Sequence, residues 1–260
     1  MPVNKIIFLQ KEKINFNNLK VVSFITKKLQ KKLILLLIDI PENQKEKVKD
    51  QLFSLDVEFE IRNQIEFSEA KDEIKTEKPD LLIVTREKIS PFEHIFKITS
   101  SERFIKGFEN IDIILLQEDC DKLEKILINV DKETSTLYYI KSAYIFAKKL
   151  GVDFHMITSF YEVFYENRLR KTHPDEEARQ LVAQLFKEHL DIVKEKIAKA
   201  LEGEKVELIV AKGDPKKEVP YYARKHHYNL LIINEDIEEK ESYIENSEMS
   251  VGIFKDEEGA

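Results

Sequence analysis

Short aliphatic runs alternate with longer amphipathic stretches along the whole chain. In the first half, the aliphatic runs predict strands at Lys5–Leu9, Leu33–Ile40, Val57–Ile61, Leu81–Thr85 and Ile111–Leu116. Between them, apolar residues recur every three or four positions, which predicts helices over about Asn18–Gln30, Glu42–Leu55, Ser68–Glu77 and Phe92–Phe108. This alternation predicts an α/β fold, in which helices cover both faces of a parallel sheet.

The second half repeats this order of elements. Lys5-Ile6-Ile7 corresponds to Lys125-Ile126-Leu127, and Leu81-Leu82-Ile83 corresponds to Leu230-Leu231-Ile232. The two segments of the later pair are separated by more residues than those of the earlier pair. The second copy therefore contains an insertion, at Ser159–Lys171 and in a long helix over about Pro174–Leu201. The fifth strand is expected at Met249–Phe254, with little chain left for a helix before it. We interpret the pattern as an internal duplication, with domains over residues 1–119 and 124–256.

The two fifth strands are expected to lie next to each other. Exposed edge strands favour pairing, and Gly252 on the second copy's fifth strand permits a close approach of the backbone. The linker from Gln117 to Glu124 spans at most about 28 Å when extended, which keeps the domains close together. We therefore expect an internal pseudo-dimer rather than two separate domains.

Composition excludes several classes of protein. Hydrophobic residues make up 42% of the chain and charged residues 35%, which suits a packed core rather than a disordered chain. The 42 Lys and Arg and 49 Asp and Glu give a net charge of −7, so no nucleic-acid partner is expected. Abundant Lys and Glu is typical of the surface ion pairs of thermophile proteins. No apolar run approaches the roughly 20 residues of a membrane span, and no secretory signal is evident, so we expect a cytoplasmic protein without a membrane partner.

The sequence contains no arrangement typical of a catalytic or metal site. A single cysteine, Cys120, excludes an internal disulfide and a thiolate metal cluster, and the acids beside it disfavour its thiolate. His226 and His227 would diverge on a helix, while His173 and Glu177 lack a third ligand. The six glycines include no pair with the spacing of a Gly-rich phosphate loop. We expect no enzymatic activity and no metal.

Several motifs of the second half occur in the order found in universal stress proteins. A first strand, Lys125–Asp131, ends in aspartate, and the helix Ser142–Val152 leads into a second strand. Gly213-Asp214-Pro215 follows the third strand, and Asn229–Asn234 forms the fourth. The second half therefore resembles a universal stress protein domain, while the first half matches it in element order. The resemblance implies two tandem open parallel five-stranded sheets of the adenine nucleotide alpha hydrolase type, with helices on both faces.

The resemblance also implies which residues would contact a cofactor such as ATP or AMP. By position these are Asp131, Gly213 and Asn234 in the second half. Asp131 lies at the strand edge where open α/β sheets bind ligands, but it would serve equally to order Thr134 before the next helix. Gly213 would allow a turn with or without a ligand.

Other features disfavour a bound nucleotide. Nucleotide-binding members of the family hold the phosphates with a Gly-x2-Gly-x9-Gly-Ser/Thr loop after the fourth strand. Here that segment, Asn234–Glu248, contains no glycine and has seven carboxylates against the single cation of Lys240. Each close like-charge contact costs on the order of 1 kcal/mol or more. In the first half, Gln10 stands where the family has its adenine-contacting aspartate.

Four aromatic residues mark the inserted segment: Phe160, Tyr161, Phe164 and Tyr165. On a helix they would form one stripe, and three cations follow within the next few residues. We expect these aromatics to be mostly buried, with at least two of them against another helix or a subunit. A lid packed on its own domain and a contact with a partner both fit this pattern, since clustered aromatic and Arg residues are typical of interfaces.

Together these features predict a non-enzymatic, stress-related regulatory or interaction protein that does not bind ATP tightly. Its partner would be an unknown protein or a second copy of the chain. The alternative is an adenine-nucleotide-binding universal stress protein with a rebuilt phosphate site and slow ATP hydrolysis. A nucleotidyl-transfer enzyme of related fold is disfavoured because the chain has no His-x-Gly-His motif.

Overall fold

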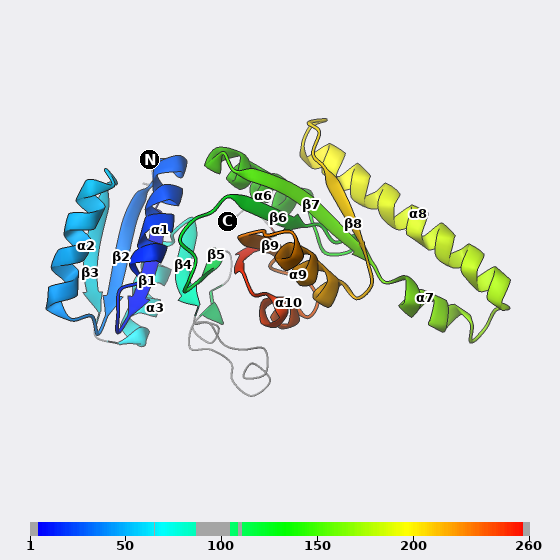
Figure 1. The fold of residues 1–260 in the computed structure, drawn as a ribbon, viewed down its shortest axis with the longest axis horizontal. Helices are drawn as coiled ribbons and strands as arrows, with labels where there is room; N and C mark the ends of the chain where they lie inside the picture. Colours follow the sequence, from blue (N-terminus) through cyan, green and yellow to red (C-terminus); the bar gives the residue numbers. More distant parts are fainter. Residues whose placement is uncertain (1–4, 65, 87–104, 109–110, 257–260) are drawn as a thin grey trace.

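The computed structural model describes residues 5–64, 66–86, 105–108 and 111–256. Its ten strands form a single sheet in the order β3-β2-β1-β4-β5-β10-β9-β6-β7-β8 (Figure 1). Neighbouring strands run parallel except at the pair formed by β5 and β10, which is antiparallel. The predicted α/β class, with parallel five-stranded halves and helices on both faces, is confirmed.

The first half follows the predicted order of elements. Its strands are β1 (Lys5–Lys11), β2 (Lys32–Ile38), β3 (Phe59–Gln64), β4 (Leu81–Arg86) and β5 (Asp112–Gln117). Its described helices are α1 (Phe16–Leu29), α2 (Glu42–Ser54) and α3 (Phe67–Glu77). The strand predicted at Val57–Ile61 begins later, at Phe59. Most of the helix predicted over Phe92–Phe108 lies outside the described residues.

The second half contains the predicted insertion. Its strands are β6 (Lys125–Asn129), β7 (Asp153–Phe160), β8 (Leu208–Lys212), β9 (Leu230–Asn234) and β10 (Ser250–Phe254). Its helices are α6 (Leu137–Leu150), α7 (Glu162–Leu169), α8 (Asp175–Ala200), α9 (Pro215–Lys225) and α10 (Lys240–Asn246). The insertion forms α7 and α8, which extend beyond β8 (Figure 1). The expected reduction of the last helix is seen in α10, which has only 7 residues.

The strand order explains where a ligand site is expected. Each half has the same internal order, with its first strand between its second and fourth strands, and the two halves are mirrored about the β5–β10 pair. Within the second half, the chain runs outward from β6 to β7 and β8 and then returns to β9 on the other side of β6. Open α/β sheets bind ligands beside the carboxyl ends of their strands at such a reversal.

The two fifth strands are paired, as predicted. Leu115 lies opposite Val251, and Ile114 lies opposite Gly252. A Cβ at Gly252 would lie 3.2 Å from both Ile232 Cγ1 and Phe254 Cε1. The space at this glycine is therefore limited by side chains of β9 and β10, and not by the neighbouring backbone as the sequence had suggested.

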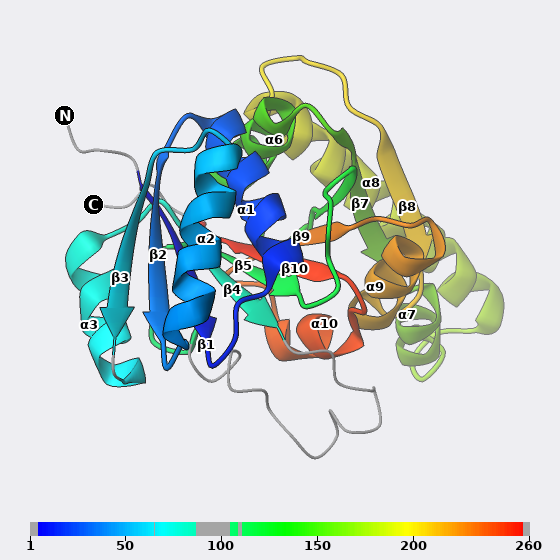
Figure 2. The same ribbon diagram turned by 60° about the vertical axis from the view of Figure 1, so that its left-hand side comes forward.

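Both hydrophobic cores extend through the two halves. On one face of the sheet, α1, α2, α6 and α8 contribute buried residues such as Leu19, Val48, Ala143 and Val193. On the other face, α3, α9 and α10 contribute buried residues that include Ala70, Ala223 and Ile244. Helices α1 and α6 pack against each other across the join, as Figure 2 shows. The halves therefore share their cores as well as their sheet.

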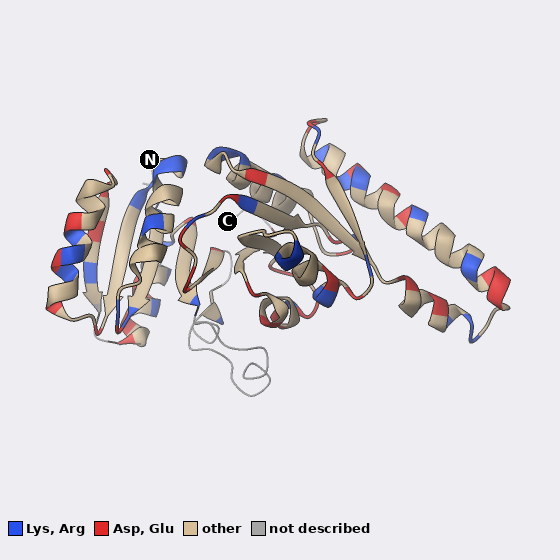
Figure 3. Cartoon of the chain, in the orientation of Figure 1, with Lys and Arg blue, Asp and Glu red and all other residues tan. Residues whose placement is uncertain are grey.

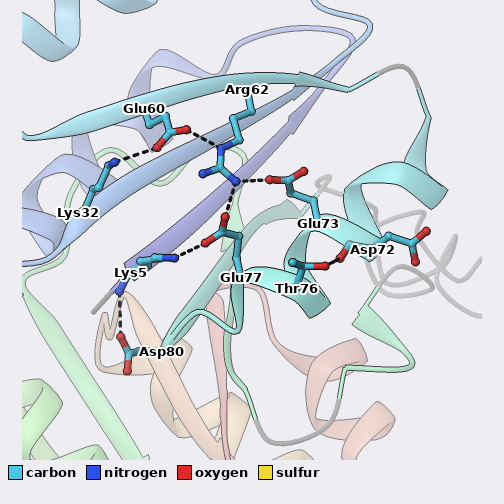
Figure 4. A network of polar contacts seen from close by, with 9 residues as sticks. All are labelled: Lys5, Lys32, Glu60, Arg62, Asp72, Glu73, Thr76, Glu77 and Asp80. Atoms are coloured by element: carbon cyan, nitrogen blue, oxygen red, sulfur yellow. Dashed lines mark hydrogen bonds and ion pairs between the residues drawn. The ribbon is translucent and has the colours of Figure 1, made fainter. Parts of the chain in front are cut away.

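An ion-pair network stabilises the β3 edge of the sheet (Figure 4). Arg62 on β3 donates to Glu60 (Nε to Oε1, 2.7 Å), to Glu73 and to Glu77 (Nη1 to Oε1, 2.6 Å). Lys32 on β2 donates to the second oxygen of Glu60 at 2.8 Å. The hydrogen bonds from Arg62 and then Lys32 lower the pKa of Glu60 to about 2. The network ties β2, β3 and α3 together.

Replacing Arg62 with alanine is expected to lower the free energy of unfolding by about 1–3 kcal/mol at pH 7, because three carboxylates each lose a hydrogen bond from the guanidinium, although Glu60 keeps Lys32 and Glu77 keeps Lys5. The lowered pKa of Glu60 makes its contribution present above the ordinary carboxylate pKa of 4.5, and that contribution is lost as the pH falls toward 2. Urea unfolding of the wild type and Arg62→Ala at pH 7 and pH 3 measures both effects.

Arg224→Ala is the matched control, because it removes a single exposed ion pair with Glu248. We expect this control to change the free energy of unfolding by less than about 1 kcal/mol. Equal losses in the two variants at pH 7, or a loss at Arg62 that does not change with pH, would contradict the prediction.

Candidate functional site

A cleft of about 380 Å³ opens in the second half at the carboxyl ends of its parallel strands. Its walls come from the loops after β6, β8 and β9, from the end of β7, and from α7, α8, α10 and the start of α9. It lies beside the reversal of strand order between β6 and β9, the usual position for a ligand site in an open α/β sheet. This cleft is the candidate functional site.

Asp131 lines the cleft and also organises the turn before α6. Its Oδ1 accepts hydrogen bonds from the backbone N–H groups of Glu133 and Thr134, both at 2.8 Å, and from Thr134 Oγ1 at 3.1 Å. Within the described chain, Oδ2 has no hydrogen-bond partner. Asp131 therefore orders Thr134 and still presents one carboxylate oxygen that a ligand could use.

Gly213 and Asn234, the other two residues suggested by the resemblance, are not part of the cleft lining. Gly213 has φ of +126° and makes the turn after β8, where its N–H donates to Phe160 O at 3.0 Å. Asn234 is fully buried, and its side chain donates to Thr134 O at 3.0 Å and accepts from Asp236 N at 2.6 Å. Both residues shape the loops around the cleft.

All four aromatic residues of the insertion line the same cleft as Asp131. Phe160 is 4% exposed, stacks on Tyr165 with centroids 5.0 Å apart, and contacts Phe186 of α8. Tyr161 and Phe164 are 37% and 48% exposed, so the expected burial is wrong for these two within a single chain. The reason is local: Phe160 ends β7 and Tyr161 caps α7, so the four residues do not form one helical stripe.

Carboxylates dominate the charges around the cleft. The lining includes five acids and two lysines: Asp131, Glu133, Asp214, Glu238, Glu239, Lys132 and Lys216. Lys132 pairs with Glu133 at 3.0 Å, and Lys216 pairs with Glu239 at 2.5 Å. No described basic side chain forms an ion pair with the remaining three acids. Away from the cleft, acidic and basic residues are interspersed along α8 (Figure 3).

Two further residues of the lining were not predicted from the sequence: His189 on α8 and Tyr243 on α10. His189 is 7% exposed, and its Nε2 lies 2.9 Å from Thr158 Oγ1. Burial lowers the pKa of His189, so its ring is neutral at pH 7. Burial also raises the pKa of Tyr243, which keeps its hydroxyl protonated. One signal was available: His189 falls at an apolar position of the stripe that contains Val182 and Val193.

The corresponding cleft of the first half is smaller, about 100 Å³. Gln10, which lines it, is 2% exposed and makes only internal contacts. Its Nε2 donates to Thr85 Oγ1 at 2.6 Å and to Leu9 O at 3.0 Å, and its Oε1 accepts from Asn15 N at 2.7 Å. The Gln10 side chain therefore uses its polar atoms to hold the first half together.

The described residues contain no group of three or more His, Cys, Asp or Glu side chains arranged to hold a metal ion. No helix among them is both long enough and apolar enough to cross a membrane. The pKa of the Cys120 thiol is raised, chiefly by burial and further by Asp119 and Asp121, in the direction expected from the sequence.

Comparison with known proteins identifies the fold. No family model and no curated protein sequence matches the chain. Among solved structures, a functionally unknown protein from Pseudomonas aeruginosa PAO1 has a TM-score of 0.72 at 14% identity, covering 98% of this chain and 93% of that chain. A universal stress protein from Archaeoglobus fulgidus DSM 4304 has a TM-score of 0.64 at 13% identity, covering 98% of this chain and 97% of that chain. The chain therefore resembles a universal stress protein in fold over nearly its whole length.

Proposed function

We propose that this protein is a cytoplasmic, non-enzymatic regulatory or interaction protein of the universal stress protein type that does not bind ATP tightly. One observation carries the proposal: the segment after β9, where nucleotide-binding members of that family hold the phosphates, is acidic and lacks glycine. Two of its carboxylates, Glu238 and Glu239, line the cleft itself. A triphosphate would therefore lose its backbone cradle and meet like charge.

The cations of the cleft do not offset this charge. Lys132 and Lys216 are each paired with a glutamate, so a phosphate would have to compete with an existing ion pair. His189 and the hydroxyl of Thr158 do not form an accessible catalytic pair either, because Thr158 is 1% exposed and out of reach of a substrate. These features support a binding role rather than catalysis.

Exposed apolar side chains support the interaction role. Tyr161 and Phe164 line the cleft, and Val163 between them is 57% exposed. Aromatic residues that remain exposed on a folded chain are typical of surfaces that contact a ligand or a partner. A protein partner or a second copy of the chain would cover them.

Purified protein is expected to show no saturable binding of ATP, ADP or AMP below about 1 mM, with or without Mg²⁺, because the cleft lacks a phosphate cradle. Isothermal titration measures this directly. Micromolar binding that is abolished by Asp131→Ala, and retained by the control Asp56→Ala at an exposed site of the first half, would contradict the proposal. That result would favour the alternative, an adenine-nucleotide-binding protein with a rebuilt phosphate site.

A further inference from the structure

We propose that the cleft of the second half binds an organic cation, an ammonium group with short apolar arms, between its aromatic rings and its unpaired carboxylates. The inference rests on the proposed function, because a cleft built for a triphosphate would require the opposite charge. Its volume of about 380 Å³ lies within the range of roughly 300–1,000 Å³ that is typical of small-molecule sites.

Aromatic rings form much of the wall. They are Phe160, Tyr161, Phe164, Tyr165 and Tyr243. The rings of Phe164 and Tyr165 meet edge to face at 5.4 Å, and those of Tyr161 and Phe164 are tilted at 5.7 Å. Phe160 and Tyr165 stack on each other, whereas Tyr161 and Phe164 are 37% and 48% exposed. Aromatic faces attract cations within about 6 Å.

The chain's own cations do not occupy these faces. Lys and Arg side chains elsewhere in the described chain lie over aromatic rings, for example Lys125 over Tyr228 and Lys148 over Tyr144. None of the cation–π contacts found among the described residues uses a ring of the cleft. The two exposed rings, Tyr161 and Phe164, therefore carry no intramolecular cation among the described residues.

The charges complement such a ligand. After the two lysine–glutamate pairs are set aside, Asp131, Asp214 and Glu238 remain without an ion-pair partner in the described chain. Asp131 additionally keeps Oδ2 without a hydrogen-bond partner in this part of the chain. Three like charges around one space raise the local concentration of cations and repel anions.

One ring nitrogen of His189, which lines the cleft, has no hydrogen-bond partner among the described residues. His189 is 7% exposed, and its Nε2 lies 2.9 Å from Thr158 Oγ1. Its Nδ1 has no hydrogen-bond partner in the described chain. Nδ1 accepts a hydrogen bond from a ligand when Nε2 carries the proton, and it donates when Thr158 Oγ1 donates to Nε2.

The first test compares a cation with its neutral shape match. Choline and 3,3-dimethylbutan-1-ol have nearly the same shape but differ in charge, and both are titrated into the full chain by calorimetry. Choline or N-acetyl-lysine amide is expected to bind at least tenfold more tightly than the alcohol. Tighter binding of choline than of the lysine amide would indicate that the ligand is a free small molecule. The reverse order would indicate a side chain of a partner protein. Equal binding of the alcohol and both cations, or no binding of either cation, would overturn the inference.

Substitutions in the cleft test whether the cation binds there. Phe164→Leu keeps an apolar side chain but removes the ring, and Asp131→Asn removes the charge; each is expected to weaken binding of the cation at least fivefold. Phe53→Leu is the matched control, since Phe53 is 73% exposed on α2 in the other half. Circular dichroism confirms that the variants are folded. Equal affinity in Phe164→Leu, Asp131→Asn and the wild type would overturn the inference.

A parallel titration with ATP separates the two proposals. Micromolar binding of ATP in the cleft would overturn both the proposed function and this inference. Absence of binding by ATP and by both cations would overturn this inference alone and leave the proposed function intact.

Discussion

Replacing Arg86 with methionine is expected to lower the free energy of unfolding by about 3–5 kcal/mol, because two buried hydrogen bonds from a charged group are lost. Arg86 ends β4 in the first half and is 1% exposed. Its Nη1 donates to Ser247 O at 3.0 Å and its Nη2 to Ile244 O at 2.8 Å, at the end of α10 in the second half. Methionine keeps the apolar stem but removes both hydrogen bonds. Ser247 O loses this donor, and Ile244 O keeps the backbone N–H of Ser247, at 3.2 Å. An unsatisfied buried carbonyl costs about 1–3 kcal/mol.

Urea unfolding measures the loss, and hydrogen exchange shows where it acts. Because Arg86 binds the carbonyls at the end of α10, the amides of α10 should exchange faster in Arg86→Met than those of α1. Arg224→Met is the control, because its guanidinium pairs with Glu248 at the surface and its loss should cost less than about 1 kcal/mol. A loss below about 1 kcal/mol at Arg86 would show that this contact does not hold the halves together.

The order of elements could be predicted because local patterns determine it. Aliphatic runs such as Lys5–Leu9 lie within observed strands, and the insertion of the second half appears as the predicted helical segment. Boundaries shift where pairing between strands decides them. Leu33 is paired with Phe59, so β3 begins there although the aliphatic pattern starts at Val57.

The cleft could not be assembled from the sequence because its residues come from separate elements. Asp131 follows β6, Phe164 lies on α7, His189 lies on α8 and Tyr243 lies on α10. The aromatic segment was misinterpreted because the chain changes from strand to helix within it, at Tyr161, so a single helical period does not apply.

The contribution of Arg86 to stability could not be predicted from the sequence either. In the sequence it is one cation after a predicted strand, with a glutamate and a lysine following it. Its burial arises from α10 of the other half, which follows more than 150 residues later in the chain. Such long-range contacts leave no local pattern, so only the folded structure reveals them.

Replacing Ile114 with aspartate is expected to lower the free energy of unfolding by more than about 4 kcal/mol. Ile114 is fully buried on β5, with Ile83 of β4 on one side and Gly252 of β10 on the other. The substitution removes an apolar side chain, at a cost of about 2–5 kcal/mol, and places a carboxylate in the core shared by both halves. The substitution therefore destabilises the β5–β10 pair, which joins the two halves.

The effect should reach both halves at once, because sheet and cores continue across the β5–β10 pair. The wild type is expected to unfold in one cooperative transition, and the variant in one transition at a lower midpoint, by calorimetry and by urea. Val210→Asp is the control: Val210 lies on the edge strand β8 and is 37% exposed, so its loss should cost about 1 kcal/mol. Two well-separated transitions in the wild type, or equal losses in the two variants, would show that the halves fold independently and that the join contributes little to stability.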